Sequence, residues 1–353
     1  MPAKYRVSFS FGLWHIHCAT PGGGGKAIHR KTVWLLVVFT LVSLRFAEAQ
    51  PAGKVPRIGF LDPTSRAVSK ARIEAFRQGL LRLGYTEGKN IAIDYRFAGG
   101  RSEQLSEVAS ELVRLNVDII VTRAIPGAVA AKQATTKTPI VFVGVADAVA
   151  AGLVASLARP GGNITGLTSL APELSGKRLE VLRETFPKLS RVAVLRNPSN
   201  AGDPITWKET EEAAQALGLQ LHSLEVRSVK DLENVFESAT KEDGQALMTL
   251  PDPLLQSHRQ EIVGFAAKSR LPGIYPDPEY VEAGGLMSYA ANPLEFYARA
   301  ASYVDRILKG AKPGDLPVEQ PTKFELVINL KAAKQIGLLV PQKVLARADK
   351  VIR

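Results

Sequence analysis

The same order of short apolar runs occurs twice in this chain of 353 residues. The run 57–61 (RIGFL) precedes Asp62-Pro63, and the run 191–195 (RVAVL) precedes Asn197-Pro198, which lies 135 positions after the first pair. Three further runs recur in the same order: 91–95 with 221–226, 117–122 with 245–250, and 139–143 with 271–275. A shared order over four strand-like runs indicates a duplicated structural unit.

Segments with helical periodicity separate these runs. Five apolar residues follow the spacing i, i+3, i+4, i+7 and i+8 of one helix face, namely Leu105, Val108, Ala109, Leu112 and Val113. Strands that alternate with helices predict βαβ units and a parallel sheet. The sequence therefore predicts an α/β chain of two similar doubly wound parallel-sheet lobes, joined by a hinge of several strands.

The tail after the second repeat is longer than one lobe requires. It holds a helical pattern from Phe296 to Leu308, a strand over 324–329 and a helix over 331–336, so we expect the chain to cross between the lobes more than once. Glycine tolerates large backbone changes, which favours hinges at Thr165-Gly166 and Gly284-Gly285. The predicted N-terminal lobe comprises residues 55–165 and 287–318, and the C-terminal lobe comprises residues 166–286 and 319–353.

Residues 1–49 are predicted to be an N-terminal extension and a signal peptide. The basic stretch His29-Arg30-Lys31 precedes 13 uncharged residues (32–44), and Ala47-Glu48-Ala49 forms a small-x-small cleavage site. The apolar run is shorter than the roughly 20 residues of a membrane span, although an uncleaved anchor is the alternative. Position 50 is Gln rather than the Cys of a lipoprotein. We expect cleavage after Ala49 and a soluble periplasmic protein.

Charge and cysteine content exclude several function classes for the rest of the chain. The net charge is +11, but six Lys/Arg and one acid lie in the first 49 residues, which leaves +6. These basic residues alternate with acids without an aromatic-basic stripe, so no nucleic acid is expected. The single cysteine, Cys18, lies in the extension, and the body has two histidines, His222 and His258. We expect no metal and no cofactor, and no nucleophile–base motif of an enzyme occurs.

Candidate ligand-binding residues follow the predicted strands. In open parallel sheets, ligands bind outside the carboxyl ends of the strands, and two facing lobes would bring these ends to one cleft. The predicted binding residues in the first lobe are Asp62, Thr64, Ser65, Thr122, Arg123 and Asp147. Those in the second lobe are Arg196, Asn197, Asn200, Asp252 and Tyr275.

Each of these residues also has a structural alternative. Asp62 and Asn197 precede prolines and could be turn or helix-capping residues, and Thr122 could bind only its own backbone. Arg123 and Arg196 could lie on the rim and pair with acids across the gap. If both arginines face the cleft, their guanidinium forks favour a carboxylate or another planar anion.

Long stretches of the chain resemble a known family. They are 74–96 (EAFRQGLLRLGYTEGKNIAIDYR), 130–135 (AAKQAT), 152–167 (GLVASLARPGGNITGL), 171–182 (APELSGKRLEVL), 279–289 (EYVEAGGLMSY) and 316–333 (LPVEQPTKFELVINLKAA). The chain resembles the ABC-transporter substrate-binding proteins with the type I periplasmic binding fold, in the subgroup that includes tryptophan- and tyrosine-binding members. The resemblance implies a secreted receptor that closes two lobes on a small solute and presents it to a membrane permease and its ATPase.

The chain departs from the family pattern at three predicted cleft positions. It has Ala146-Asp147-Ala148 where the family often has Gly-Asp-Pro, Arg123 where a small residue is usual, and Arg196 where an aromatic residue is common. We therefore expect a small amino-acid-like or carboxylate solute. Two alternatives are a solute-sensing receptor for a membrane signalling protein and a secreted α/β enzyme.

Overall fold

The computed structural model describes residues 54–241 and 244–353, so the predicted signal peptide lies outside the described residues. The first lobe is built on a five-stranded parallel sheet in the order β2-β1-β3-β4-β5. Its strands are β1 (Arg57–Asp62), β2 (Ala92–Phe97), β3 (Ile119–Arg123), β4 (Ile140–Val145) and β5 (Ile164–Thr168).

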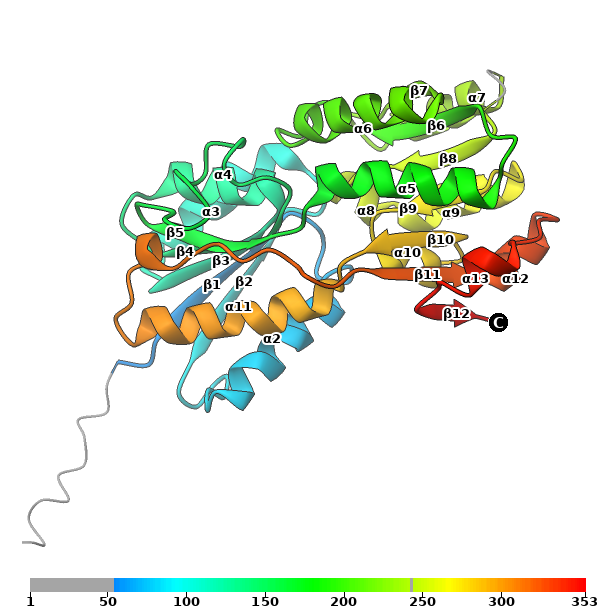
Figure 1. The fold of residues 1–353 in the computed structure, drawn as a ribbon. Coiled ribbons are helices and arrows are strands. Elements are labelled where there is room, and N and C mark those ends of the chain that lie inside the picture. The colour runs from blue at the N-terminus through cyan, green and yellow to red at the C-terminus, as the bar shows by residue number, and fades with distance from the viewer. Residues whose placement is uncertain (1–53, 242–243) are drawn as a thin grey trace, which may run out of the picture. The chain divides into compact units, whose positions relative to one another are not determined.

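Helices cover both faces of this sheet (Figure 1). One face packs against α3 (Leu105–Arg114) and α4 (Ala124–Ala134), with a short turn of 3₁₀ helix (Ser102–Gln104) before α3. The other face packs against α2 (Lys70–Arg82) and α11 (Pro293–Leu308), which run along each other. Strands β1, β3, β4 and β5 are largely buried, which explains their mostly apolar sequence. The edge strand β2 is half-buried and carries Asp94 and Arg96.

The second lobe is built on a seven-stranded sheet in the order β12-β11-β10-β9-β8-β6-β7. Its pairs are parallel except for β10 and β11, which are antiparallel. The strands are β6 (Arg191–Arg196), β7 (Gln220–Glu225), β8 (Ala246–Thr249), β9 (Gly273–Tyr275), β10 (Met287–Ala290), β11 (Glu325–Asn329) and β12 (Lys350–Ile352). The predicted α/β fold of two similar lobes is confirmed.

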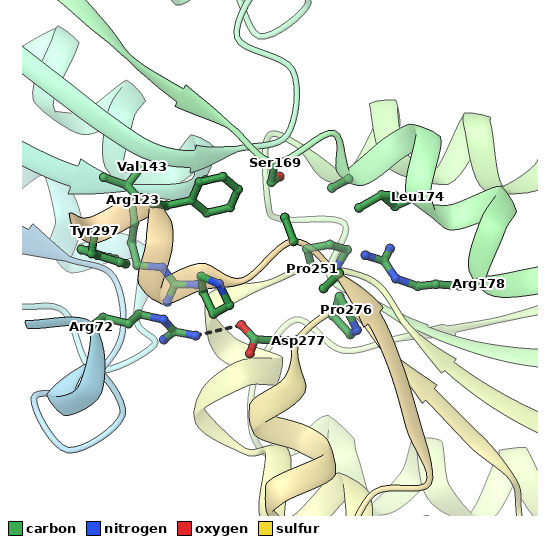
Figure 2. A pocket seen from close by; sticks show the side chains of 16 residues that line it. Arg72, Arg123, Val143, Ser169, Leu174, Arg178, Pro251, Pro276, Asp277 and Tyr297 are labelled. Atoms are coloured by element: carbon green, nitrogen blue, oxygen red, sulfur yellow. Dashed lines mark hydrogen bonds and ion pairs between the residues drawn. The ribbon is translucent and has the colours of Figure 1, made fainter. Parts of the chain in front are cut away.

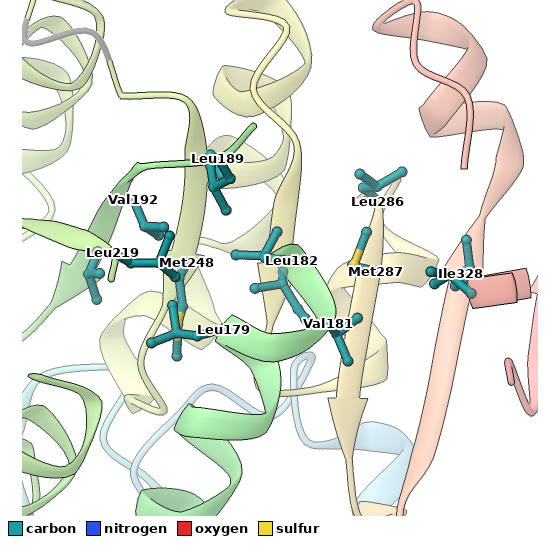
Figure 3. Close-up of a cluster of buried hydrophobic side chains, with 14 of the residues drawn as sticks. Leu179, Val181, Leu182, Leu189, Val192, Leu219, Met248, Leu286, Met287 and Ile328 are labelled. Carbon is teal, nitrogen blue, oxygen red and sulfur yellow. The ribbon is translucent and has the colours of Figure 1, made fainter. Parts of the chain in front are cut away.

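Two apolar clusters lie on opposite faces of the second sheet. The larger one packs α5 (Ala171–Thr185) and α6 (Asp203–Leu217) against strand residues such as Val192, Met248 and Ile328 (Figure 3). It also receives α12 (Leu330–Gln335) and α13 (Gln342–Leu345). The opposite cluster includes residues of four helices: α7 (Asp231–Lys241), α8 (Pro253–Ser257), α9 (Arg259–Lys268) and α10 (Pro278–Glu282).

The chain passes between the two sheets three times: after β5, after β10 and before β11. A short 3₁₀ turn (Pro313–Asp315) follows α11 before the last passage. The sheets place β5 in the first lobe through Thr168 and β10 in the second lobe through Ala290, a few residues beyond the predicted boundaries at 165 and 287. Gly284-Gly285 lies before β10 inside the second lobe, with Gly285 against Tyr275 and Tyr280. The passage between the lobes follows β10, at 291–292.

Candidate functional site

A cavity of about 100 Å³ lies between the two lobes, where the carboxyl ends of both sheets meet. Figure 2 shows side chains of α2, β3 and α11 on one side of it and side chains of α5 and the loops after β8 and β9 on the other. Its volume is several times what one water molecule needs. Three arginines line this cavity, Arg72, Arg123 and Arg178, together with one carboxylate, Asp277.

Arg72 joins the lobes across the cavity. Its Nη2 donates to Oδ2 of Asp277 at 2.8 Å and lies 3.0 Å from Oε1 of Glu279. The Arg72 side chain is only 1% exposed. Burial by itself would lower the pKa of Arg72, but the carboxylates of Asp277 and Glu279 raise that pKa above its ordinary value. The guanidinium is therefore a charged bridge between α2 and the loop before α10.

Arg178 enters the cavity from α5 in the second lobe. Its Nε donates to the carbonyl oxygen of Tyr289 at 3.0 Å. Its Nη1 is buried without a hydrogen-bond partner in the described part of the chain. Burial lowers the pKa of Arg178 to about 10, while the charge of Asp277 opposes this shift. Arg178 is thus a buried guanidinium whose hydrogen-bonding capacity is mostly unused.

Arg123 is the last residue of β3 and lies at the centre of the cleft. Its Nη1 is 3.8 Å from Oδ1 of Asp62, beyond hydrogen-bond reach, and has no hydrogen-bond partner among the described residues. The next residue, Ala124, has a left-handed backbone with φ of 55°. Leu170, between two cavity-lining residues, has φ of 52°. Left-handed backbone at non-glycine residues costs free energy and concentrates at functional sites.

The remaining wall of the cavity is largely apolar. Phe296 and Tyr297 of α11 lie in the first lobe, and Pro251, Pro276 and Leu174 lie in the second. The Tyr297 hydroxyl is buried without a hydrogen-bond partner in residues 54–241 and 244–353, and burial raises its pKa above the ordinary tyrosine value. Guanidinium and hydroxyl donors therefore face an apolar, partly aromatic chamber.

A second cavity of about 60 Å³ adjoins the first and shares Arg123, Gly144, Ser169 and Pro251 with it. Its carboxylate is Asp252, the N-cap of α8. The Asp252 carboxylate accepts the N–H groups of Leu254 and Leu255 and the side-chain amides of Asn197 and Asn200.

Four donors thus surround the Asp252 carboxylate. Burial raises the pKa of Asp252 above its usual value, although these hydrogen bonds oppose the shift. A carboxylate with all its acceptor positions occupied fixes the loop, and it leaves little capacity for a ligand.

Three predicted binding residues line these cavities: Arg123 in both, and Asn200 and Asp252 in the second. Asn197 does not line either cavity, but its amide holds Asp252 at 3.2 Å. Asp147 accepts the N–H groups of Val149 and Ala150, which is the capping role that the sequence left open for other residues.

The other first-lobe candidates line neither cavity. Asp62 is fully buried and accepts hydrogen bonds from Thr64 and Ser69. Ser65 accepts the N–H of Val68 at 3.4 Å, and Thr122 is buried against α4 at Gly127. These residues shape the loop after β1 and the end of β3.

Arg196 and Tyr275 also lie outside both cavities. Arg196 forms an ion pair with Asp203, and its guanidinium lies 4.5 Å from the centroid of the Trp207 ring. Both groups come from α6, the helix that follows β6. Tyr275 is fully buried and stacks on Tyr280 with ring centroids 4.9 Å apart. The pairing of Arg123 with Arg196 across the cleft is therefore replaced by Arg123 with Arg72 and Arg178.

Arg72 and Arg178 are not among the residues predicted from the strand ends, because both come from helices. Each interrupts an apolar helix face: Arg72 precedes Phe76 by four residues, and Arg178 lies midway between Leu174 and Leu182. Arginine is rarely buried without a partner, so a single arginine in an apolar stripe was the available signal.

No group of three or more His, Cys, Asp or Glu side chains among the described residues could hold a metal ion. No helix in this part of the chain is long and apolar enough to cross a membrane.

Comparisons with known proteins agree on a family. The family model described as "ABC transporter substrate binding protein" matches residues 58–352. A curated relative, the tyrosine-binding protein of Clostridioides difficile (strain R20291), is 26% identical over 293 residues, which cover 82% of this chain and 83% of the relative.

Solved structures match over most of the chain as well. A conserved domain protein of Vibrio cholerae has a TM-score of 0.80 and 30% identity, covering 84% of this chain and all of its own. A domain from Streptococcus pneumoniae in complex with L-Trp has a TM-score of 0.79 and 26% identity, covering 84% of this chain and 99% of its own. The ligand-free, open structure of a substrate-binding protein from Clostridium difficile has a TM-score of 0.61 and 25% identity, covering 84% and 99%.

The L-Trp complex and the ligand-free, open protein have nearly the same sequence identity to this chain, 26% and 25%. Their TM-scores differ, at 0.79 and 0.61. The arrangement described here is therefore closer to that of the L-Trp complex than to that of the ligand-free, open protein. Contacts between the lobes agree with this, because Ile205 of α6 packs against the apolar cluster of the first lobe.

Proposed function

The chain belongs to the ABC transporter substrate binding protein family, and we propose that it is the exported solute receptor of an importer. In this proposal it captures a small amino-acid-like or carboxylate solute between its two lobes. The observation that carries the proposal is the interlobe cavity, in which buried guanidinium donors of Arg123 and Arg178 lack hydrogen-bond partners within the described chain. Buried polar groups are normally satisfied, and a bound solute would satisfy these.

The mechanism proposed is lobe closure. Arg72 and Arg123 come from the first lobe, and Arg178 and Asp277 come from the second, so a solute in this cavity contacts both lobes only when they are together. Such a solute binds the closed form more tightly than the open form and shifts the population toward closure. The radius of gyration from solution scattering should fall when solute is added, and an unchanged radius at saturation would contradict closure.

The relatives narrow the range of solutes to be tested. One is named as a tyrosine-binding protein and another was solved with L-Trp. Amino acids and other small carboxylates share the group that arginine forks bind in two hydrogen bonds. Native mass spectrometry of the protein purified from its own periplasm should find a bound solute of this class. A protein that carries no solute and binds none of a broad panel of metabolites would contradict the proposal.

The proposed receptor function includes export to the periplasm and transfer of the solute to a membrane transporter. The signal within residues 1–49, which begins at the basic stretch His29-Arg30-Lys31, favours delivery to the periplasm with cleavage after Ala49. A permease with its ATPase would receive the solute from the closed receptor. N-terminal sequencing of the mature protein should begin at Gln50. Retention of Trp34 in the mature protein would show instead that the segment is an uncleaved anchor.

A further inference from the structure

We propose that the cleft recognises its solute by a carboxylate alone and requires no ammonium group, with Arg178 as the anchoring fork. This inference rests on the proposed function, and it narrows the solute class to organic monocarboxylates with an apolar or aromatic body. The observation that carries it is that arginine donors in the cleft lack hydrogen-bond partners among the described residues. The carboxylates Asp277 and Asp252 already have partners within the protein.

Each of the three arginines in the cleft has a hydrogen-bond donor that no described residue accepts. Nη1 of Arg72, Nη1 of Arg123 and Nη1 of Arg178 are all buried without a hydrogen-bond partner in the part of the chain that the structure describes. Arg178 differs from the other two, because no carboxylate among the described residues lies within 4.0 Å of it. A buried cation without a counterion is costly, and a carboxylate from the solute would compensate it.

The carboxylates of the cleft, by contrast, already have partners within the protein. Asp277 and Asp252 are the carboxylates that line the two cavities. Both oxygens of Asp277 accept hydrogen bonds, one from Glu279 N–H and one from Arg72. Asp252 accepts four hydrogen bonds from the protein. An ammonium group in the cleft would therefore meet an Asp277 whose charge is already paired with Arg72, and it would find the Asp252 acceptors already in use.

The surroundings of Arg178 indicate the rest of the solute. Figure 2 shows its guanidinium turned toward Pro251 and Pro276, with Leu174 on the same side of the cavity. Phe296 and Tyr297 form the facing wall from α11. Apolar and aromatic side chains bind hydrocarbon or ring surfaces without requiring further polar groups. A carboxylate with a short apolar or aromatic body satisfies both parts of the chamber.

Matched ligands test the inference directly. Each triplet keeps one body and changes only the charged groups: 3-(4-hydroxyphenyl)propionate, L-tyrosine and tyramine, and likewise indole-3-propionate, L-tryptophan and tryptamine. Calorimetric titration should show that each deaminated carboxylate binds at least as tightly as the corresponding amino acid, and that neither amine binds. An amino acid that binds tenfold or more tightly than its deaminated analogue would overturn the inference.

A panel of straight-chain and aromatic carboxylates of increasing size extends this test to other bodies. Binding by any of them without an ammonium group supports the inference, and failure of the whole panel overturns it. The proposed function is judged separately by the solute that copurifies: an amino acid there would keep the receptor function and refute the carboxylate-only recognition.

Variants assign the role of Arg178. Arg178→Gln should weaken binding of the carboxylate by roughly 10- to 100-fold, as expected for a lost charge-assisted hydrogen bond. Arg178→Lys keeps the charge without the fork and should give an intermediate affinity. The matched control is Arg183→Gln, because Arg183 lies on the same helix but is exposed. Equal affinity of Arg178→Gln and Arg183→Gln for the carboxylate would refute the assignment.

Discussion

Nη2 of Arg72 donates to Oδ2 of Asp277 at 2.8 Å, across 205 positions of sequence and from one lobe to the other. The bond is buried, since the exposed fractions of the two side chains are 1% and 14%. Glu279 adds a second carboxylate at 3.0 Å from the same nitrogen. A pair of this kind exists only while the lobes are together, so it stabilises the closed form against opening and, where the closed form is the native state, also against unfolding.

Arg72→Gln should therefore shift the population toward the open form. The substitution leaves Asp277 and Glu279 without their cation, and removing one partner of a buried pair costs about 3–5 kcal/mol. We expect a larger radius of gyration in solution scattering and a solute affinity at least tenfold lower. Arg77→Gln is the control, because Arg77 lies on the same helix but is exposed. The same radius and affinity for both variants would show that the bridge does not stabilise closure.

Glu279→Gln should stabilise the protein at neutral pH. Burial, together with the negative charge of Asp277, raises the pKa of Glu279 above its usual value, although Arg72 opposes this. A carboxyl group with a raised pKa in the folded state binds its proton more tightly there than in the unfolded chain. Its ionised form therefore costs stability above the raised pKa, and the cost disappears as pH falls through that pKa.

In the parent protein, the side-chain amide of Gln256 donates to the Glu279 carboxylate at 2.7 Å. A Gln at position 279 can still accept a hydrogen bond from Arg72. Its own amide can donate to the side-chain oxygen of Gln256. The melting temperature of Glu279→Gln should exceed that of the parent by about 2 °C at pH 7, for a gain on the order of 1 kcal/mol. The difference should shrink toward pH 4. A constant difference from pH 4 to 8, or a lower melting temperature at pH 7, would contradict the raised pKa.

The fold was predictable because its signals are local and repeated. The four apolar runs that begin at β1 recur in the same order from β6. They form β1 to β4 of the first sheet and β6 to β9 of the second sheet. The antiparallel β11 and the addition of β12 to the second sheet were not predictable in the same way. They belong to the tail, which has no counterpart in the first repeat.

The site was predictable only in part, because its key charges depend on packing between distant helices. Arg123 follows a strand and was found from the strand pattern. Arg196 also follows a strand, but Asp203 and Trp207 lie within eleven residues of it and engage it first. Arg72 and Arg178 reach the cleft because α2 and α5 present an arginine on their buried faces.

Gly202→Val should hinder closure by steric contact. A Cβ atom at Gly202 would lie 2.7 Å from Cδ1 of Ile125, which belongs to the opposite lobe. The backbone at Gly202 has φ of −87° and ψ of −12°, which valine can adopt. The contact with Ile125 is therefore the tightest one, while Asn200 Oδ1 of the same lobe lies at 3.5 Å, an ordinary van der Waals distance. We expect weaker solute binding, an increased radius of gyration and an unchanged circular dichroism spectrum. Gly264→Ala is the control, because a Cβ at Gly264 meets no atom within 4 Å, and binding as tight in Gly202→Val as in this control would refute the contact.

Arg178→Met should keep or raise the stability of the solute-free protein, whereas Arg72→Met should lower it. Without solute, the Arg178 guanidinium has one hydrogen bond, to the Tyr289 carbonyl, and no carboxylate partner within the described residues. Replacing a buried charge by an apolar side chain of similar length is often neutral or stabilising by about 1–4 kcal/mol. The solute-free Arg178→Met protein should therefore melt at the same temperature as the parent or several degrees higher, while it loses binding of the carboxylate.

Arg72→Met should melt lower, because it leaves Asp277 and Glu279 buried without a cation. Differential scanning calorimetry of both variants, with and without solute, makes the comparison. A large loss of stability in solute-free Arg178→Met would mean that the protein itself compensates this charge, and the case for a solute carboxylate at Arg178 would fail.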